Sequence, residues 1–244
     1  MIFSTRSQLN HFINNIVNNY GKEYHRSTIE AAIRSLQEFY RAMKTNNYNL
    51  LDMPPTLDRI FIDSATDPDS PKLVILDMSP DGLPAPLSVK QFITYYLALL
   101  LYKTFVEYRS AAMSGSGNMR VVLLAIEEAQ NFAPNLQTYK LGYSVAKSVL
   151  STIATQGRKF GISLLLVTQR PLYVDPVVMS MMNTFIIHRV PAYDTRFVER
   201  VAGMISKDVV ASLPTMERGS ALIVGQMNPS PLPMRVKIDK RRGP

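Results

Sequence analysis

The 244-residue chain contains no cysteine and only three histidines. Without cysteine there can be no disulfide framework, no thiolate metal site and no cysteine nucleophile. The histidines (His11, His25 and His188) are too scattered along the sequence to indicate a zinc site. The composition therefore excludes the disulfide-stapled and zinc-binding classes and fits an intracellular protein.

Long apolar runs are also missing. The longest, Tyr95 to Tyr102, falls far short of the roughly 20 residues that a membrane-spanning helix needs. The first residues, Met-Ile-Phe-Ser-Thr-Arg-Ser-Gln, lack the charged-then-apolar layout of a signal peptide. The sequence predicts a soluble, cytoplasmic protein with no membrane partner.

A third absence concerns phosphate binding. Nothing in the chain matches Gly-x-x-x-x-Gly-Lys-Ser/Thr, the loop whose backbone amides cradle nucleotide phosphates. Gly21-Lys22 is followed by Glu23, and Gly115 and Gly117 have no lysine nearby. The phosphate-binding loop is therefore absent from these 244 residues.

Acidic residues are few relative to basic ones. The chain has 19 Asp and Glu against 27 Lys and Arg, which gives a formal net charge of +8 at pH 7. Such an excess favours a polyanionic partner, nucleic acid first. A basic protein with a solvated cationic face is the alternative that charge by itself leaves open.

Hydrophobic periodicity divides the chain into three parts. Residues 1–55 show helical spacing, for example at Leu9, Phe12, Ile13 and Ile16, and predict a helical insertion or appendage. Residues 72–238 alternate strands and helices, which predicts an α/β fold with a mostly parallel sheet covered by helices. Residues 239–244 form a basic tail. Strands are predicted at 73–76, 121–126, 162–168, 184–188, 221–224 and 234–238, and long helices at about 88–108 and 141–156.

The strand that ends at Ile126 runs directly into Glu127 and Glu128. Open α/β sheets bind their ligands at the carboxyl edge, where this acid pair would lie. An NTPase needs one acid to hold Mg²⁺ through water and a second to orient the attacking water. The alternative is a helix whose first turn is acidic, because glutamate stabilises a helix N-terminus.

Two further motifs follow in order. Glycines bracket Arg158 and Lys159 directly before a buried strand, and an arginine there suits stabilisation of charge on a transferring phosphoryl group. A helix C-cap with two cations is the alternative. The next strand ends in Thr168 and Gln169, where Gln169 can bond a γ-phosphate or the attacking water, although this pair of residues is common at strand ends.

Together these motifs resemble the C-terminal half of the HerA-type ATPases, hexameric DNA translocases of the HerA/FtsK branch of P-loop proteins. The resemblance rests on Ile126–Pro134, Gly157–Gly161 and Val167–Pro171, and it continues through Asn183-Thr184, Arg189 and Glu217–Gly219. It covers about residues 73–238. One departure is Gln130, which stands where the family often has histidine.

The resemblance implies a RecA-like P-loop ATPase core that closes into a hexameric ring around DNA, with ATP and Mg²⁺ as cofactors. Glu127 would be the Walker B acid near Mg²⁺, and Glu128 would polarise water. Arg158 would be a finger that reaches the ATP of the adjacent subunit, with Lys159 as the weaker candidate. Gln169 would act as a sensor, and Thr168 would lie with it at the nucleotide.

We therefore expect the ATPase half of a double-stranded DNA translocase or helicase that acts in DNA end processing and repair. A NurA-type nuclease is the partner that archaeal members of the family imply. Without a phosphate loop the chain by itself is expected to be inactive. Two alternatives stay open: a non-catalytic ring subunit that donates an arginine finger, and a conjugation or DNA-packaging ATPase.

Overall fold

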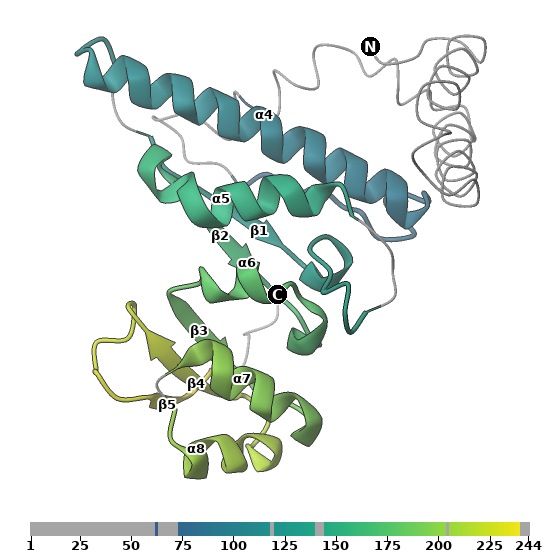
Figure 1. Cartoon of the computed structure of the whole chain (residues 1–244), viewed down its shortest axis with the longest axis vertical. Helices are drawn as coiled ribbons and strands as arrows, with labels where there is room; N and C mark the ends of the chain where they lie inside the picture. Colours follow the sequence, from purple (N-terminus) through teal and green to yellow (C-terminus); the bar gives the residue numbers. More distant parts are fainter. Residues whose placement is uncertain (1–61, 63–72, 118–119, 140–143, 204, 240–244) are drawn as a thin grey trace, which may run out of the picture. The chain divides into compact units, whose positions relative to one another are not determined.

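The computed structural model describes residue 62 and residues 73–117, 120–139, 144–203 and 205–239 (Figure 1). The chain divides into two compact units, Met1–Ile93 and Thr94–Pro244. The predicted helical appendage (1–55) and most of the basic tail lie outside the described residues.

The first unit corrects one prediction. Residues 73–76 form no strand, and Leu73 and Ile75 are 87% and 75% exposed. An apolar run becomes a strand only where a second backbone pairs with it, and no described residue pairs with this one. A turn follows, in which Asp77 Oδ1 accepts the Ser79 amide at 2.8 Å. The hydrogen bonds from Ser79 lower the pKa of the Asp77 carboxyl.

The predicted apolar helix is confirmed as α4, Leu87–Met113, which extends beyond the expected end. In the second unit, Tyr102 of α4 meets the Phe160 ring edge-on, with the ring centroids 5.5 Å apart. The Tyr102 hydroxyl also donates to Gln156 Oε1 at 3.2 Å. Both partners belong to α5, Ala146–Phe160, so these contacts tie α4 to α5.

A parallel pair of strands lies against α5 (Figure 1). The strands β1 (Val122–Ile126) and β2 (Ile162–Leu166) pair in register, with Ile126 opposite Leu166. The buried residues of α5 recur at helical spacing, so they lie on one apolar face of the helix, and that face packs against the strands. These residues are Ala146, Val149, Leu150, Ile153 and Gly157.

Two glycines allow α5 to lie close to the strands. A Cβ on Gly157 would lie 2.8 Å from the Ile162 carbonyl oxygen. Gly161 caps α5 with a positive φ of 84°, and a Cβ there would run into the Arg120 carbonyl oxygen. Of the two glycines that bracket Arg158 and Lys159, Gly157 is inside the helix, so the chain turns only at Gly161.

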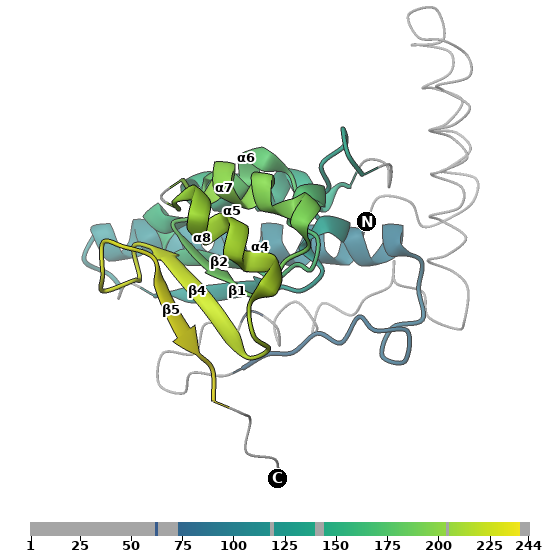
Figure 2. The ribbon, with the colours of Figure 1, turned by 90° about the horizontal axis from the view of Figure 1, so that it is seen from below.

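The remaining strands form a second, antiparallel sheet in the order β3-β4-β5. These are β3 (Thr184–Ile187), β4 (Ser220–Gly225) and β5 (Met234–Lys237), and Figure 2 shows β5 beside β4. The α/β class is thus confirmed, with parallel β1 and β2 and an antiparallel trio that periodicity did not reveal. Periodicity shows which residues are buried but not strand direction, whereas the short link from β4 to β5 permits only an antiparallel hairpin.

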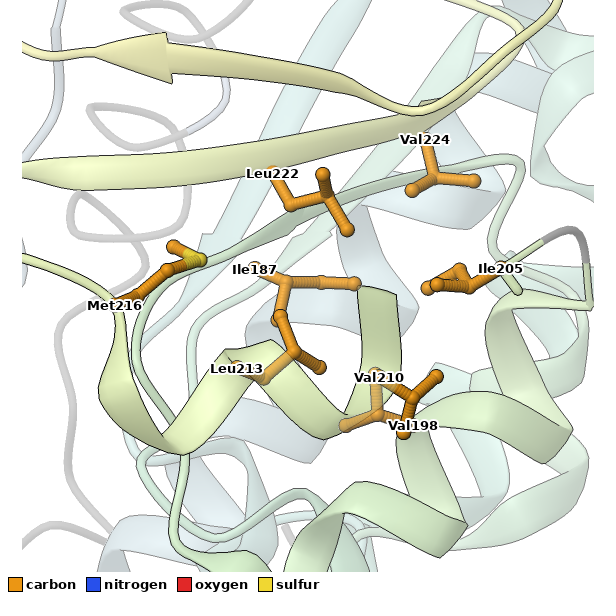
Figure 3. Packing of buried hydrophobic residues seen from close by; sticks show 8 residues of the cluster. All are labelled: Ile187, Val198, Ile205, Val210, Leu213, Met216, Leu222 and Val224. Carbon is orange, nitrogen blue, oxygen red and sulfur yellow. The ribbon is translucent and has the colours of Figure 1, made fainter. Parts of the chain in front are cut away.

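One face of this sheet carries the core of the region. Helices α7 (Thr195–Ala202) and α8 (Lys207–Ser212) pack on it, together with the 3₁₀ turn η5 (Leu213–Thr215) (Figure 2). Figure 3 shows the apolar side chains that meet there. They are Ile187, Val198, Ile205, Val210, Leu213, Met216, Leu222 and Val224.

Among the described residues, no helix combines the length and the apolar character needed to cross a membrane.

The cluster in Figure 3 yields a stability prediction. Leu213 is a fully buried member of the cluster, so Leu213→Ala should lower the free energy of unfolding by about 2–5 kcal/mol. Urea titration followed by circular dichroism measures this. The control Leu232→Ala changes a side chain that is 71% exposed and should stay within about 0.5 kcal/mol of wild type. Equal losses for both variants would mean that Leu213 is not a core residue.

Candidate functional site

The two parallel strands end at the same edge, as expected. Beyond β1 and β2 the backbones stay paired, because Val167 N donates to Ile126 O at 2.9 Å and Ala129 N donates to Val167 O at 3.0 Å. The polar residues that follow each strand therefore lie side by side. This edge brings Glu128 next to Thr168 and Gln169, and Glu127 directly precedes Glu128 in the chain.

Glu128 has an unusual backbone. Its φ of 50° and ψ of 46° are left-handed, and it is the one residue other than glycine with positive φ in the described ranges. For a residue with a Cβ this conformation costs on the order of 1–3 kcal/mol, and such strain clusters at functional sites. It reverses the chain into the 3₁₀ turn η2, Ala129–Asn131. The backbone conformation of Glu128 therefore helps to set the direction of its side chain.

A hydrogen-bonded cluster holds the Glu128 carboxylate. Gln169 Nε2 donates to Oε1 at 3.2 Å, and Gln130 Nε2 donates to Oε2 at 2.5 Å. Gln130 Oε1 in turn accepts the Thr168 hydroxyl at 2.6 Å, and Thr168 Oγ1 accepts the Arg170 amide at 3.0 Å. Bonds to a charged acceptor are roughly twice as strong as neutral ones. We call Glu128, Gln130, Thr168 and Gln169 the carboxylate cluster.

Glu127 lies beside this cluster and is exposed. No group of three or more Asp, Glu, His or Cys side chains within the described ranges could form a complete metal cage. Mg²⁺ differs from other metals here, because it usually binds through one or two carboxylates, with water and phosphate oxygens completing the shell. The exposed Glu127 carboxylate at the strand edge fits that mode of binding.

Backbone contacts brace the chain on both sides of the cluster. Asn135 N donates to Tyr173 O at 2.8 Å, and Asp175 N donates to Ala133 O at 2.8 Å. The buried Ser144 hydroxyl donates to Phe132 O at 2.7 Å. The segments that follow β1 and β2 therefore form one braced unit.

Asp175 completes this bracing. Its Oδ1 caps helix α6 (Pro176–Ser180) by accepting the amides of Val177 at 3.0 Å and Val178 at 3.1 Å. Its other oxygen pairs with Lys147 of α5 at 2.5 Å. One buried carboxylate thus joins two helices, a role that the sequence did not indicate.

A stack of side chains lies at the same edge. Tyr139 and Tyr173 are parallel, with ring centroids 4.9 Å apart, and the Arg170 guanidinium lies 5.5 Å from the Tyr173 ring centroid. The Tyr139 hydroxyl donates to Asn131 Oδ1 at 3.3 Å. Since Arg170 directly follows Gln169, the stack fixes the chain just beyond the carboxylate cluster.

The structure does not bring Arg158 or Lys159 to this cluster. Both are exposed in the last turn of α5, which leads into the start of β2, whereas Glu128 follows the end of β1. The length of the strand pair separates the two edges by about 16 Å at roughly 3.3 Å per residue. Within one chain, the acids and the basic pair therefore lie at opposite edges of the parallel pair.

Sequence reasoning missed two residues of this region. Gln130 was noted only as a departure from the family pattern, yet it links Glu128 to Thr168. Asp194 belongs to none of the motifs found in the sequence. It is fully buried just before α7, and neither of its carboxylate oxygens has a hydrogen-bond partner among the described residues.

No protein-family model matches the chain. Several curated helicases do, each over part of its length. A probable DNA double-strand break repair helicase HerA of Methanocaldococcus jannaschii is 40% identical over 123 residues, which is 50% of this chain and 23% of that protein. The HerA helicase of Sulfurisphaera tokodaii is 37% identical over 123 residues, again 50% and 23%. That of Saccharolobus solfataricus is 30% identical over 157 residues, 64% and 29%.

The predicted resemblance to HerA-type proteins is therefore confirmed for half of the chain or more. The chain spans less than a third of the length of these relatives. Among solved structures, the genome packaging NTPase B204 of Sulfolobus turreted icosahedral virus 2, in complex with ATP-gammaS, is similar with a TM-score of 0.40. It is 17% identical and covers 61% of this chain and 64% of its own, a likeness too distant to assign a fold or ligand.

Asp194 gives a prediction about pH. Burial raises the pKa of its carboxyl, and the positive charge of Arg170 and the nearby Leu172 backbone amide offset part of that rise. A raised pKa means that folding favours the protonated form, so this contribution to stability is lost as the pH rises through the pKa of the folded state. The neutral substitution Asp194→Asn should therefore raise the melting temperature at about pH 7–8, by about 2–4 °C if the gain is roughly 1 kcal/mol.

Thermal melts across pH values measure this. The gain should shrink as the pH falls toward the usual aspartate range of about 3.9. Asp81→Asn, at an exposed position, is the matched control and should show no such gain. A lower melting temperature for Asp194→Asn at every pH would mean that a partner stabilises the ionised carboxylate.

Proposed function

We propose that this chain is the acid-bearing part of an ATP-dependent double-stranded DNA translocase or helicase of the HerA type, which acts in DNA end processing. One observation carries the proposal. Glu128, Thr168 and Gln169, from two separate motifs, meet in a single hydrogen-bonded cluster at the carboxyl edge of parallel strands. The core would be RecA-like, with Glu128 and Gln169 in the roles that the resemblance implies.

When bound, ATP supplies the γ-phosphoryl group for transfer to water, and Mg²⁺ supplies positive charge against its oxygens. Glu127 would hold the metal through its exposed carboxylate. Glu128 would orient the attacking water, and its fixed position lowers the cost of reaching the reactive geometry. Gln169 would exchange its bond to Glu128 for one to phosphate or water, and Thr168 would hold the neighbouring edge of the site.

The opposite placement of Arg158 supports action on a neighbouring subunit. The exposed Arg158 guanidinium is about a strand length from the acids of its own chain. In a head-to-tail ring it would instead reach the site formed by the acids of a neighbouring copy. There it would stabilise the charge on the transferring phosphoryl group. Lys159, one residue on and also exposed, would accompany it as a further cation at the phosphates.

We propose the rest of the assembly from the sequence and from the resemblance to the HerA-type proteins. A segment that carries a phosphate-binding loop must complete the site, because these 244 residues contain none. The net charge of +8 suits a DNA duplex as the substrate. A hexameric ring and a NurA-type nuclease partner complete the proposal.

Arg158 provides the first test. In rings assembled with a phosphate-loop segment, Arg158→Ala should lower ATP hydrolysis by about 10³-fold or more and spare ATP binding, because the finger acts only in the transition state. When variant and wild-type chains are mixed, activity should fall faster than the wild-type fraction. Arg200→Ala, an exposed arginine in the last turn of α7, is the matched control.

The same mixed rings separate catalytic from supporting chains. If this chain hydrolyses ATP, Glu128→Gln should abolish turnover as fully as Arg158→Ala. If it only donates the finger, Glu128→Gln should leave turnover intact while Arg158→Ala still removes it. Activity that declines only in proportion to the wild-type fraction would exclude a finger that acts between subunits.

DNA binding provides a second test. Neutralisation of backbone phosphates releases counterions, so the affinity of the chain for duplex DNA should fall steeply and linearly on a plot of log affinity against log salt. Fluorescence anisotropy with two unrelated duplexes of equal length measures both slope and sequence preference. Salt-insensitive binding, or a strong preference for one duplex, contradicts the translocase function.

A further inference from the structure

Gln130 occupies a special place in the carboxylate cluster. It lies in η2, two residues after Glu128, and is only 6% exposed. Both ends of its amide are used, since Nε2 donates to Glu128 Oε2 and Oε1 accepts the Thr168 hydroxyl. Through these two bonds it links the Glu128 carboxylate to Thr168, which follows β2.

The two amides that bond Glu128 differ in their surroundings. Gln169 is exposed, whereas Gln130 is only 6% exposed and uses its amide oxygen as well, to accept the Thr168 hydroxyl. A buried polar group that loses its partner is costly, so Gln130 has no cheap alternative to Glu128. Gln169 can exchange its bond for water. Gln130 is therefore the lasting partner and Gln169 the exchangeable one.

The chemistry needed at position 130 is one donor and one acceptor on a neutral group. Glutamine meets it, and so does a neutral imidazole, which carries a donor on one nitrogen and an acceptor on the other. A carboxylate would face Glu128 with like charge, and an aliphatic side chain would leave the carboxylate and the hydroxyl without this bridge. Among neutral side chains, glutamine therefore meets the requirement at position 130.

We propose that Gln130 is a positioning residue, which holds the Glu128 carboxylate in the orientation for water activation and ties it to Thr168 across the two strand ends. The proposal rests on the function proposed above. It assigns Gln130 no contact with nucleotide. Gln130 acts only through Glu128, so a change at Gln130 should alter the rate of ATP hydrolysis and leave the affinity for nucleotide unchanged.

The first test uses ATP hydrolysis by the assembled protein. Gln130→Ala should lower kcat by about 10²-fold with little change in KM, as expected when a reacting group is misplaced. Gln137→Ala, an exposed glutamine in the same segment, is the control and should leave both constants unchanged. A larger effect on KM than on kcat would overturn the positioning role.

The pH dependence separates positioning from a merely structural role. Gln130→His should restore most of kcat above about pH 6.5 and lose it below, because a protonated imidazole has no acceptor and places positive charge against Glu128. Identical pH profiles for wild type and Gln130→His would overturn the proposal.

A second measurement needs neither nucleotide nor activity. In the isotope-labelled chain, the Gln130 side-chain amide should give a displaced, slowly exchanging NMR signal. That signal should move in Glu128→Ala and in Thr168→Val, while the signal of Gln137 stays in place. A Gln130 signal that responds to neither substitution would overturn the proposal. If the wild-type assembly fails to hydrolyse ATP, the proposed function fails, and the amide signals by themselves decide the role of Gln130.

Discussion

The site depends on one constraint, the parallel register of β1 and β2. Pairing of Ile126 with Leu166 puts both strand ends at one edge, and two further backbone bonds carry the pairing past the strands. Polar side chains about 40 residues apart in the sequence, such as Glu128 and Gln169, are thereby brought within hydrogen-bonding distance. A slip of one residue would turn every side chain of β2 to the other face and separate Thr168 from Gln130.

The braces around this edge have a common logic. Each is a polar side chain or backbone group that would be costly to bury alone, and each has a partner, either on the continuation of the other strand or within its own segment. Asp175 is the clearest case, since it satisfies the start of α6 and also pairs with Lys147. The carboxylate cluster is therefore held by a frame whose own bonds are complete. Asp194 differs from these groups, because neither of its buried carboxylate oxygens has a hydrogen-bond partner among the described residues.

Much of this could be predicted from sequence. The strands β1 and β2, the helix α5 between them and the acids at the end of β1 could be predicted from apolar runs and from the glycines and prolines that end them. These are local features of the sequence. The partner of Glu128 could not be predicted, because it depends on a left-handed backbone at a residue that seldom adopts one. The exposed run at Leu73 and the antiparallel pairing of β3 with β4 also escaped prediction, since both depend on which backbone lies alongside. Burial of Asp194 is a property of packing and leaves no trace in local sequence.

The two glycines at the end of α5 have a mechanical meaning. Because neither carries a side chain, the last turn of the helix rests directly on backbone carbonyls of Ile162 and Arg120, with no adjustable layer between. The height and tilt of the Arg158 backbone are therefore set by peptide groups, whose geometry hardly varies. A movement of the strand pair would pass to that arginine almost undamped, so in the ring proposed above the state of one site would reach the next as a displacement.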